Sequence, residues 1–145
     1  MKHIKQFTEI DCGFAVAAML AGVEYLEALD LDPAPDEDRG LRVAEMADLL
    51  QTLTRKQWAV SKRHYQKPLS AIGLDAVVKD GPIALLLRRP EVTFGHWVAC
   101  TKERIHDPEF ARPRVIKRYD RADWRVIRII SPCWAQPSLI TSGLF

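Results

Sequence analysis

The sequence predicts a single α+β domain over residues 1–145, with N-terminal helices packed on a C-terminal antiparallel sheet. Apolar residues recur at the helical period of 3.6 up to about residue 80, and beyond that point the pattern becomes strand-like. The chain is 48% hydrophobic and 28% charged, which is typical of one globular domain with its own core.

The first predicted helix lies in the run DCGFAVAAMLAGV, residues 11–23, which is apolar on all sides. Asp11 is placed to cap its start and Gly22 lies near its end, so we expect a helix buried on most sides. Residues 30–40 combine five acids, two prolines and a glycine without periodicity and predict a solvated loop. An amphipathic helix is expected next, with a helically spaced apolar stripe of Val43, Met46, Ala47, Leu50 and Leu53.

The run PLSAIGLDAVVKDG, residues 68–81, predicts a further short helix that ends at Gly81-Pro82. Strands are then expected over residues 83–87, 92–101 and 125–130, with a weaker one over 115–119, while 58–65 could be a strand or a loop. Alternation along 92–101 divides the side chains between two faces. One face carries Phe94, His96, Val98 and Cys100, and the other carries Gly95, Trp97 and Ala99.

Charge and cysteine usage narrow the function classes. Lys and Arg number 21 against 19 Asp and Glu, so a nucleic-acid partner is not expected. The spacing of Cys12, Cys100 and Cys133 fits neither a zinc motif nor a disulfide framework, which predicts free thiols, a cytoplasmic location and no metal or other cofactor. The apolar run from Gly13 to Val23 is shorter than the roughly 20 residues that cross a bilayer, so no membrane span is expected. The oligomeric state stays open.

Cys12 is a candidate nucleophile because it falls in the first turn of the buried helix. Backbone N–H groups and the helix dipole stabilise a thiolate there, although the neighbouring Asp11 disfavours one. The alternative interpretation is a small buried hydrophobe, which is the usual role of cysteine.

A thiol nucleophile needs a base, a group that orients the base, and donors for the oxyanion. His96 is the candidate base, and Asp107, just before Pro108, could accept a hydrogen bond from its imidazole. Gln6, six residues before Cys12, could supply an oxyanion donor beside the backbone N–H of Cys12.

Several segments together resemble the C39-type papain-like cysteine peptidases, the leader-peptide peptidases of bacteriocin export. The run Gln6-Phe-Thr-Glu-Ile-Asp11-Cys12-Gly13 resembles their Gln and Asp-Cys-Gly-Pro elements at the head of the core helix. Gly81 to Leu87, leading to Gly95-His96-Trp97-Val98, resembles the strand before their catalytic histidine and the histidine motif itself. Ile105-His106-Asp107-Pro108 resembles their Asp-Pro element, so the likeness spans about residues 1–110.

The resemblance implies a papain-like fold with Cys12 as nucleophile, His96 as base, Asp107 as orienting group and Gln6 as oxyanion donor. It also implies a peptide or protein substrate cleaved after small residues such as Gly-Gly. Phe14 departs from the family's proline, and the hairpin between His96 and Asp107 must be tight. Residues 111–145 have no counterpart in the family pattern.

The other candidates are expected to be structural. His106 is an alternative base, but its side chain should point away from the face that Asp107 uses. His3 and His64 are expected at the surface, and Cys100 lies too far along its strand from His96 to share a metal. Seven Lys and Arg in residues 112–128 predict a solvated strand face. The core or a groove wall is expected to hold Trp58, Trp97, Trp124 and Trp134.

The sequence therefore favours a cysteine peptidase that hydrolyses a peptide or isopeptide bond through a thioester on Cys12. One alternative is a catalytically idle domain of the same fold that binds a peptide tail as a regulatory or partner-recognition module. A related acyl-transfer enzyme, in which an amine replaces water, is the third hypothesis.

Overall fold

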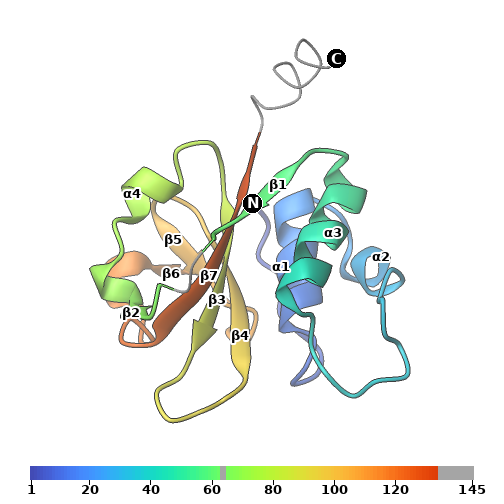
Figure 1. Cartoon of the computed structure of the whole chain (residues 1–145), viewed down its shortest axis with the longest axis horizontal. Coiled ribbons are helices and arrows are strands. Elements are labelled where there is room, and N and C mark those ends of the chain that lie inside the picture. The colour runs from blue at the N-terminus through green and yellow to red at the C-terminus, as the bar shows by residue number, and fades with distance from the viewer. Residues whose placement is uncertain (63–64, 134–145) are drawn as a thin grey trace.

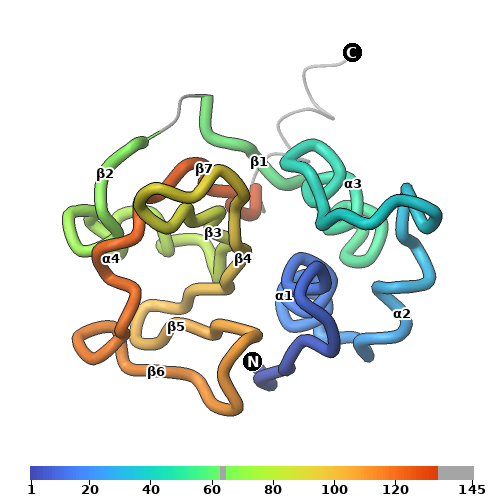
Figure 2. Tube along the Cα trace, turned by 90° about the horizontal axis from the view of Figure 1, so that it is seen from below, coloured from blue at the N-terminus to red at the C-terminus, as the bar shows by residue number. Residues whose placement is uncertain are grey.

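The computed structural model describes residues 1–62 and 65–133 and divides them into a helical half and a sheet half (Figure 1). Seen from below, α1 lies beside β4, and the N-terminus lies between α1 and the β5–β6 edge (Figure 2). The helical half contains α1 (Cys12–Ala21), α2 (Tyr25–Leu29) and α3 (Val43–Thr54). The expected α+β layout, with N-terminal helices against an antiparallel sheet, is confirmed.

The described strands form one sheet in the order β1-β7-β3-β4-β5-β6, with β2 also paired to β7, and all of these pairings are antiparallel. The strands are β1 (Trp58–Val60), β2 (Lys67–Pro68), β3 (Ile83–Arg88), β4 (Gly95–Cys100), β5 (Arg104–His106), β6 (Arg114–Val115) and β7 (Arg125–Pro132).

The sheet has a separate apolar cluster on each face, as the all-apolar β3 sequence predicts. Ala84 of β3 packs in the cluster that surrounds α1, whereas Leu85 and Leu87 pack in the other. α1 is buried over most of its length, as expected. A Cβ on Gly13 would lie 3.0 Å from a Leu41 methyl and 3.1 Å from the Trp97 ring, so the glycine after Cys12 permits the close approach of α1 to β4.

Residues 68–81 do not form the single helix that was expected. A 3-10 turn (Leu69–Ala71) and the one-turn helix α4 (Leu74–Val77) are separated by an extended residue, Ile72. The N–H groups of Leu69 and Ser70 donate to backbone carbonyls of residues 124 and 122, which ties the first turn to another segment of the chain. Isoleucine and glycine at 72 and 73 are weak helix formers, so the tertiary bonds decide the local structure.

Three other expectations need correction or refinement. Of the weak strand expected over 115–119, only Val115 lies in a strand, as the end of β6, and Ile116–Arg118 forms a 3-10 turn. Helix α2 was not predicted, because five residues are too few for a periodic signal. Asp11 occupies the N-cap position of α1 without capping it, because its carboxylate accepts a hydrogen bond from the Tyr25 hydroxyl instead.

Among the described residues, no helix has both the length and the apolar character needed to cross a bilayer.

Candidate active site

The β4–β5 hairpin brings His96 and Asp107 together on one face of the sheet. Ala99 pairs with His106, so residues 98 and 107 face each other one step further along and share a face with His96. His96 Nε2 lies 2.7 Å from Asp107 Oδ1, and both side chains are buried. The expected hydrogen-bonded pair is confirmed.

His106 points to the opposite face, as its place in the strand predicts. Its Nδ1 lies 3.3 Å from Nδ1 of His3, whose Nε2 in turn donates to the carbonyl of Phe110. Burial and the nearby positive charges of His3 and the N-terminus lower the pKa of His106 to about 4. His3 is therefore half-buried and bonded, not a surface residue as expected, and His106 is not positioned to act on Cys12.

Cys12 meets His96 where the start of α1 reaches the start of β4. The backbone N–H of Trp97 donates to Cys12 Sγ at 3.5 Å, and interaction with the Cys12 side chain is one of the causes that raise the pKa of His96. Nε2 of the imidazole bonds Asp107, so Nδ1 is the nitrogen available to the thiol, and Nδ1 also lies 3.6 Å from Oε1 of Glu109. Cys12 is only 5% exposed, so any reactant must reach it along the adjoining surface hollow.

The local electrostatics favour a protonated His96. Burial alone would lower the pKa of His96, but hydrogen bonds and charge interactions with Asp107 and Cys12 outweigh it and raise the pKa to about 9.

Asp107 is held as an acceptor by four donors. Besides His96, its carboxylate receives the hydroxyl of Tyr119 at 2.6 Å, a guanidinium N–H of Arg121 at 3.0 Å and the backbone N–H of Glu109 at 3.0 Å. Burial acts to raise the pKa of Asp107, yet the bonds and charges from His96 together with the other donors leave it lowered. Asp107 is thus an anion fixed in position, which in turn fixes the imidazole ring.

Arg121 and Glu109 complete the charge balance around the pair. Arg121 bonds both Asp107 and Glu109, and its guanidinium stacks 4.4 Å from the Trp124 ring centroid. Trp124 also contacts the His96 ring edge to face. Ligand atoms of His96, Asp107 and Glu109 lie within 4.8 Å of one another, which is a possible metal cluster. Arg121 already supplies the cationic partner of both carboxylates, so these donors fit a guanidinium better than an added cation.

Gln6 lies at the edge of this site. Its backbone N–H donates to the carbonyl of Pro108 at 2.8 Å, which places it next to Asp107 in space. One side-chain N–H donates to the carbonyl of Thr8, while Oε1 is buried without a partner. Within the described part of the chain, its side chain forms no hydrogen bond with Cys12. Each amide nitrogen has two N–H groups, so one donor of Gln6 is not needed by Thr8.

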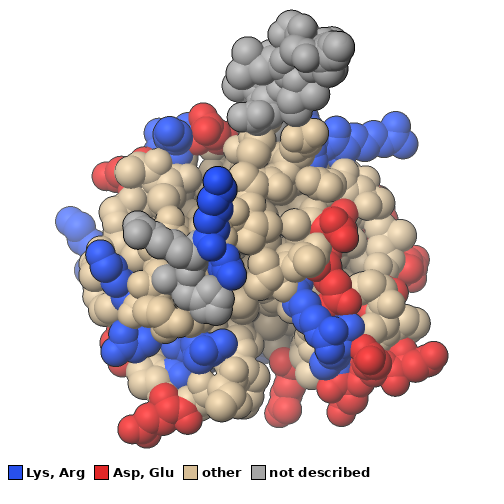
Figure 3. Space-filling model, viewed as in Figure 1, with Lys and Arg blue, Asp and Glu red and all other residues tan. Residues whose placement is uncertain are grey.

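A groove of about 640 Å³ begins at Cys12 and runs between the two halves. Figure 3 shows the surface hollowed between the halves at the lower edge of the view, with acidic side chains along its helical side. Figure 2 looks onto the same end of the molecule. The lining comes from the 38–43 segment, from Leu86 of β3, and from Glu9, Ile10, Cys12, Phe94, Gly95 and Trp97.

Sequence reasoning missed Tyr119, Arg121 and Glu109, and it placed Trp124 only in the core or a groove wall. Tyr119, Arg121 and Trp124 come from the segment after residue 110, where the resemblance had no counterpart. Arg121 was one of seven basic residues in 112–128, and no spacing rule separates it from its neighbours. Three of these arginines have partners within the chain. Arg121 bonds Asp107 and Glu109, while Arg125 and Arg128 donate to the carbonyls of Gln66 and Ser61. The expected solvated strand face is therefore partly a set of internal contacts.

Cys100 and Trp58 lie away from the site, whereas Trp97 contacts Cys12 and lines the groove. Cys100 is buried, its thiol donates to the Thr101 carbonyl, and burial raises its pKa to about 12. Trp58 and Trp97 belong to the core, as expected. His64 and Trp134 lie outside the described residues.

His96 is expected to titrate near pH 9, well above the ordinary 6.5 of histidine, because the bonds to Asp107 and Cys12 favour its charged form. A raised pKa in the folded state stabilises the fold fully below about 6.5, and this contribution is lost as the pH rises through about 9. Nitrogen-15 NMR of the imidazoles between pH 5 and 10 measures this directly. His106 is the internal control, since it should stay neutral over the same range. A His96 midpoint near 6.5 would contradict the assignment.

No model of a known protein family matches this sequence, and no curated protein matches it.

Proposed function

We propose that this chain is a papain-like cysteine peptidase that hydrolyses a peptide or isopeptide bond through a thioester on Cys12. The observation that carries the proposal is the imidazole of His96. Its Nε2 is held by a buried carboxylate at 2.7 Å, and Cys12 at the start of α1 is one of the groups that raise its pKa. This arrangement activates a cysteine nucleophile and fixes its base.

In the first half of the reaction, the thiol proton passes to Nδ1 of His96, whose raised pKa favours the protonated imidazole, and the Cys12 thiolate then attacks the carbonyl carbon. The backbone N–H of Cys12 and the spare N–H of Gln6 stabilise the oxyanion. Because the Asp11 carboxylate bonds Tyr25, it leaves the first N–H groups of α1 available for that purpose. His96 then protonates the leaving amine as the C–N bond breaks, and the acyl group stays on sulfur.

In the second half, a water molecule gives a proton to His96 and attacks the thioester carbonyl. The C–S bond breaks, the carboxylic acid leaves, and His96 returns its proton to the thiolate. Asp107 stays ionised throughout, because its four donors favour the carboxylate form.

The fold and the compartment belong to the same proposal. A buried cysteine helix in one half, a histidine hairpin in the other and a groove between them support a papain-like arrangement. Three cysteines without a disulfide support a reducing compartment, and we place the peptidase in the cytoplasm.

Labelling with iodoacetamide near neutral pH tests the nucleophile. Cys12 is expected to react at least tenfold faster than Cys100 and Cys133, because only Cys12 combines a helix N-terminus with a neighbouring histidine whose pKa it helps to raise. Mass spectrometry of peptides from the labelled folded protein identifies the modified residue. Cys133→Ser is the matched control and should leave the labelling rate unchanged.

His96→Ala should slow the labelling of Cys12 toward the rate of an ordinary thiol. Equal labelling of all three cysteines in the folded protein would remove Cys12 as nucleophile. Rapid labelling without a peptide-derived thioester from any substrate would favour the idle peptide-binding domain.

A further inference from the structure

The groove beside Cys12 lies on the acyl side of the proposed reaction. The leaving amine must be close to the His96 imidazole, which donates its proton. His96 and Trp97 are consecutive in β4 and point to opposite faces, and Trp97 and Gly95 line the groove. The part of the substrate that stays on sulfur therefore extends from Cys12 along the Trp97 side.

The floor of the groove is apolar and firmly held. The indole N–H of Trp97 donates to the Leu41 carbonyl at 3.0 Å, which fixes the two walls together across the gap. Leu86 and Val43 are only partly buried, and Phe94 at the mouth is 76% exposed. Exposed apolar side chains around a concave surface gain free energy when a ligand's apolar group covers them.

The volume also exceeds what a chain of glycines fills. A groove of about 640 Å³ over an apolar floor leaves water against Leu86, Val43 and Phe94 when the substrate has no side chains. In an extended peptide, consecutive side chains point to opposite sides. One of the two residues before the scissile bond therefore faces the floor.

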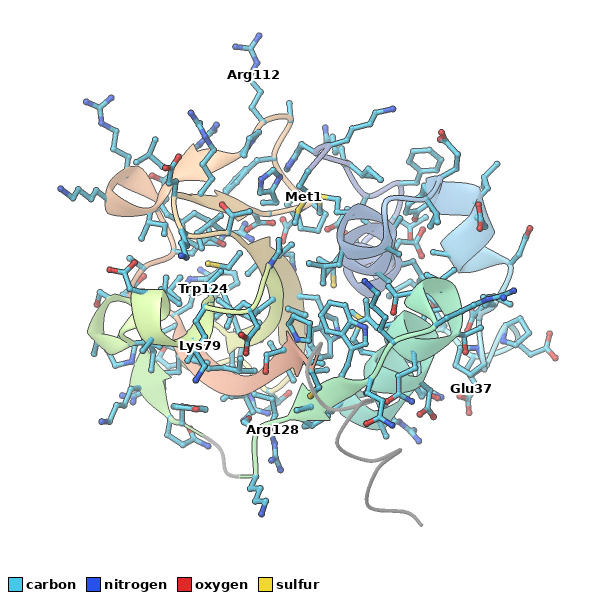
Figure 4. The ribbon with its side chains drawn as sticks, turned by 90° about the horizontal axis from the view of Figure 1, so that it is seen from above. Met1, Glu37, Lys79, Arg112, Trp124 and Arg128 are labelled. Carbon is cyan, nitrogen blue, oxygen red and sulfur yellow. The ribbon has the colours of Figure 1, made fainter. Side chains whose placement is uncertain are left out.

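The helical wall of the groove carries an excess of negative charge. Glu9, Asp38, Arg39 and Arg42 line it, and Arg39 is paired with Glu37 and Glu45 outside it. With Glu37 and Glu45 counted, four carboxylates lie near the two guanidinium groups of Arg39 and Arg42. Glu9 and Asp38 form no ion pair within the part of the chain that the structure describes. Figure 4 places Glu37 on this helical half, and Lys79, Arg112 and Arg128 on the sheet half.

We propose that the groove selects a peptide with a bulky apolar side chain at one of the two positions before the scissile bond and a basic side chain upstream of it. This inference rests on the proposed function for the position of the bond, and it departs from the Gly-Gly preference that the family resemblance implies. The apolar group covers Leu86, Val43 and Phe94, and the basic group lies against Glu9 and Asp38.

Binding to the Cys12→Ala protein tests the groove without any chemistry. The probes are fluorescent peptide acids that end in Lys-Gly-Leu, Lys-Leu-Gly or Lys-Gly-Gly, which match the acyl product. We expect the tighter-binding of the two leucine peptides to bind at least tenfold more tightly than Lys-Gly-Gly, because its side chain covers apolar surface that glycine leaves exposed to water. Replacing the lysine by glutamate should weaken binding several-fold, and less so at high salt.

Variants locate the two contacts. Leu86→Phe, which fills the floor, should reduce the leucine-to-glycine affinity ratio to threefold or less. Glu9→Gln and Asp38→Asn should each reduce the preference for lysine over glutamate. Asp36→Asn is the matched control, since Asp36 is exposed on the same loop and does not line the groove.

Turnover of the matching amide substrates by the unmodified protein separates this inference from the proposed function. Leucine-selective binding without turnover supports the groove and contradicts the peptidase. If the protein cleaves these substrates but binds Lys-Gly-Gly as tightly as the leucine peptides or more tightly, the peptidase function is supported and the apolar specificity of the groove is contradicted. An apolar preference that Leu86→Phe does not change also overturns it.

Discussion

Replacing His96 by alanine is expected to reduce turnover by about 10⁴–10⁶-fold while the protein stays folded. His96 takes the thiol proton, protonates the leaving amine and activates water, so a single change removes every proton transfer of the proposed cycle. The measurement is kcat/KM on a peptide that the unmodified protein cleaves, with a thermal melt to show that the variant is folded.

His106→Gln is the matched control for this variant. His106 lies on the adjacent strand, is as buried as His96 and contacts His3 on the opposite face. It should change kcat/KM less than about threefold. If His96→Ala kept turnover within tenfold of the unmodified protein, His96 would not be the base.

The sequence was most informative where pattern and local geometry agree. Consecutive residues of a strand point to opposite faces, so the tight hairpin alone places Asp107, not His106, with His96. The apolar run after Cys12 predicts a buried helix, because no polar residue offers it an exposed face. These parts of the site follow from spacing within one or two elements.

The rest of the site depends on contacts between segments that no local pattern reveals. Tyr119 and Arg121 reach Asp107 only because the chain turns back after β6, and nothing near them in sequence signals that return. The Asp11 carboxylate is diverted from its capping position by Tyr25, fourteen residues away. Glu109 follows Asp107 by two residues, but its pairing with Arg121 depends on the same tertiary turn.

Asp107→Asn is expected to lower kcat/KM by about 10²–10⁴-fold, although the amide has nearly the shape of the carboxylate. All four contacts of Asp107 come from donors, namely His96, Tyr119, Arg121 and the backbone N–H of Glu109. An asparagine presents one oxygen and one NH₂ group, so in either orientation its NH₂ faces other donors. The imidazole then loses its anionic partner and its fixed ring position.

The loss should show in a pH profile as well as in rate. The Asp107 charge is one of the causes that raise the pKa of His96 to about 9, so in the variant the His96 midpoint should fall toward 6.5. The unmatched donors should also reduce the free energy of unfolding by about 1–3 kcal/mol.

A second substitution distinguishes donor conflict from a simple packing defect. Arg121→Met removes the guanidinium 3.0 Å from Oδ2, which can only donate, whereas the Tyr119 hydroxyl can turn to accept from the new NH₂ group. We expect the double variant to recover roughly tenfold in kcat/KM over Asp107→Asn, whereas Arg121→Met alone should lower it. Additive losses, with the His96 midpoint still near 9 in Asp107→Asn, would mean that Asp107 is a core residue that does not orient the base. Recovery together with a lowered midpoint would identify Asp107 as the residue that holds His96 ready for proton transfer, with Tyr119 and Arg121 setting its charge state.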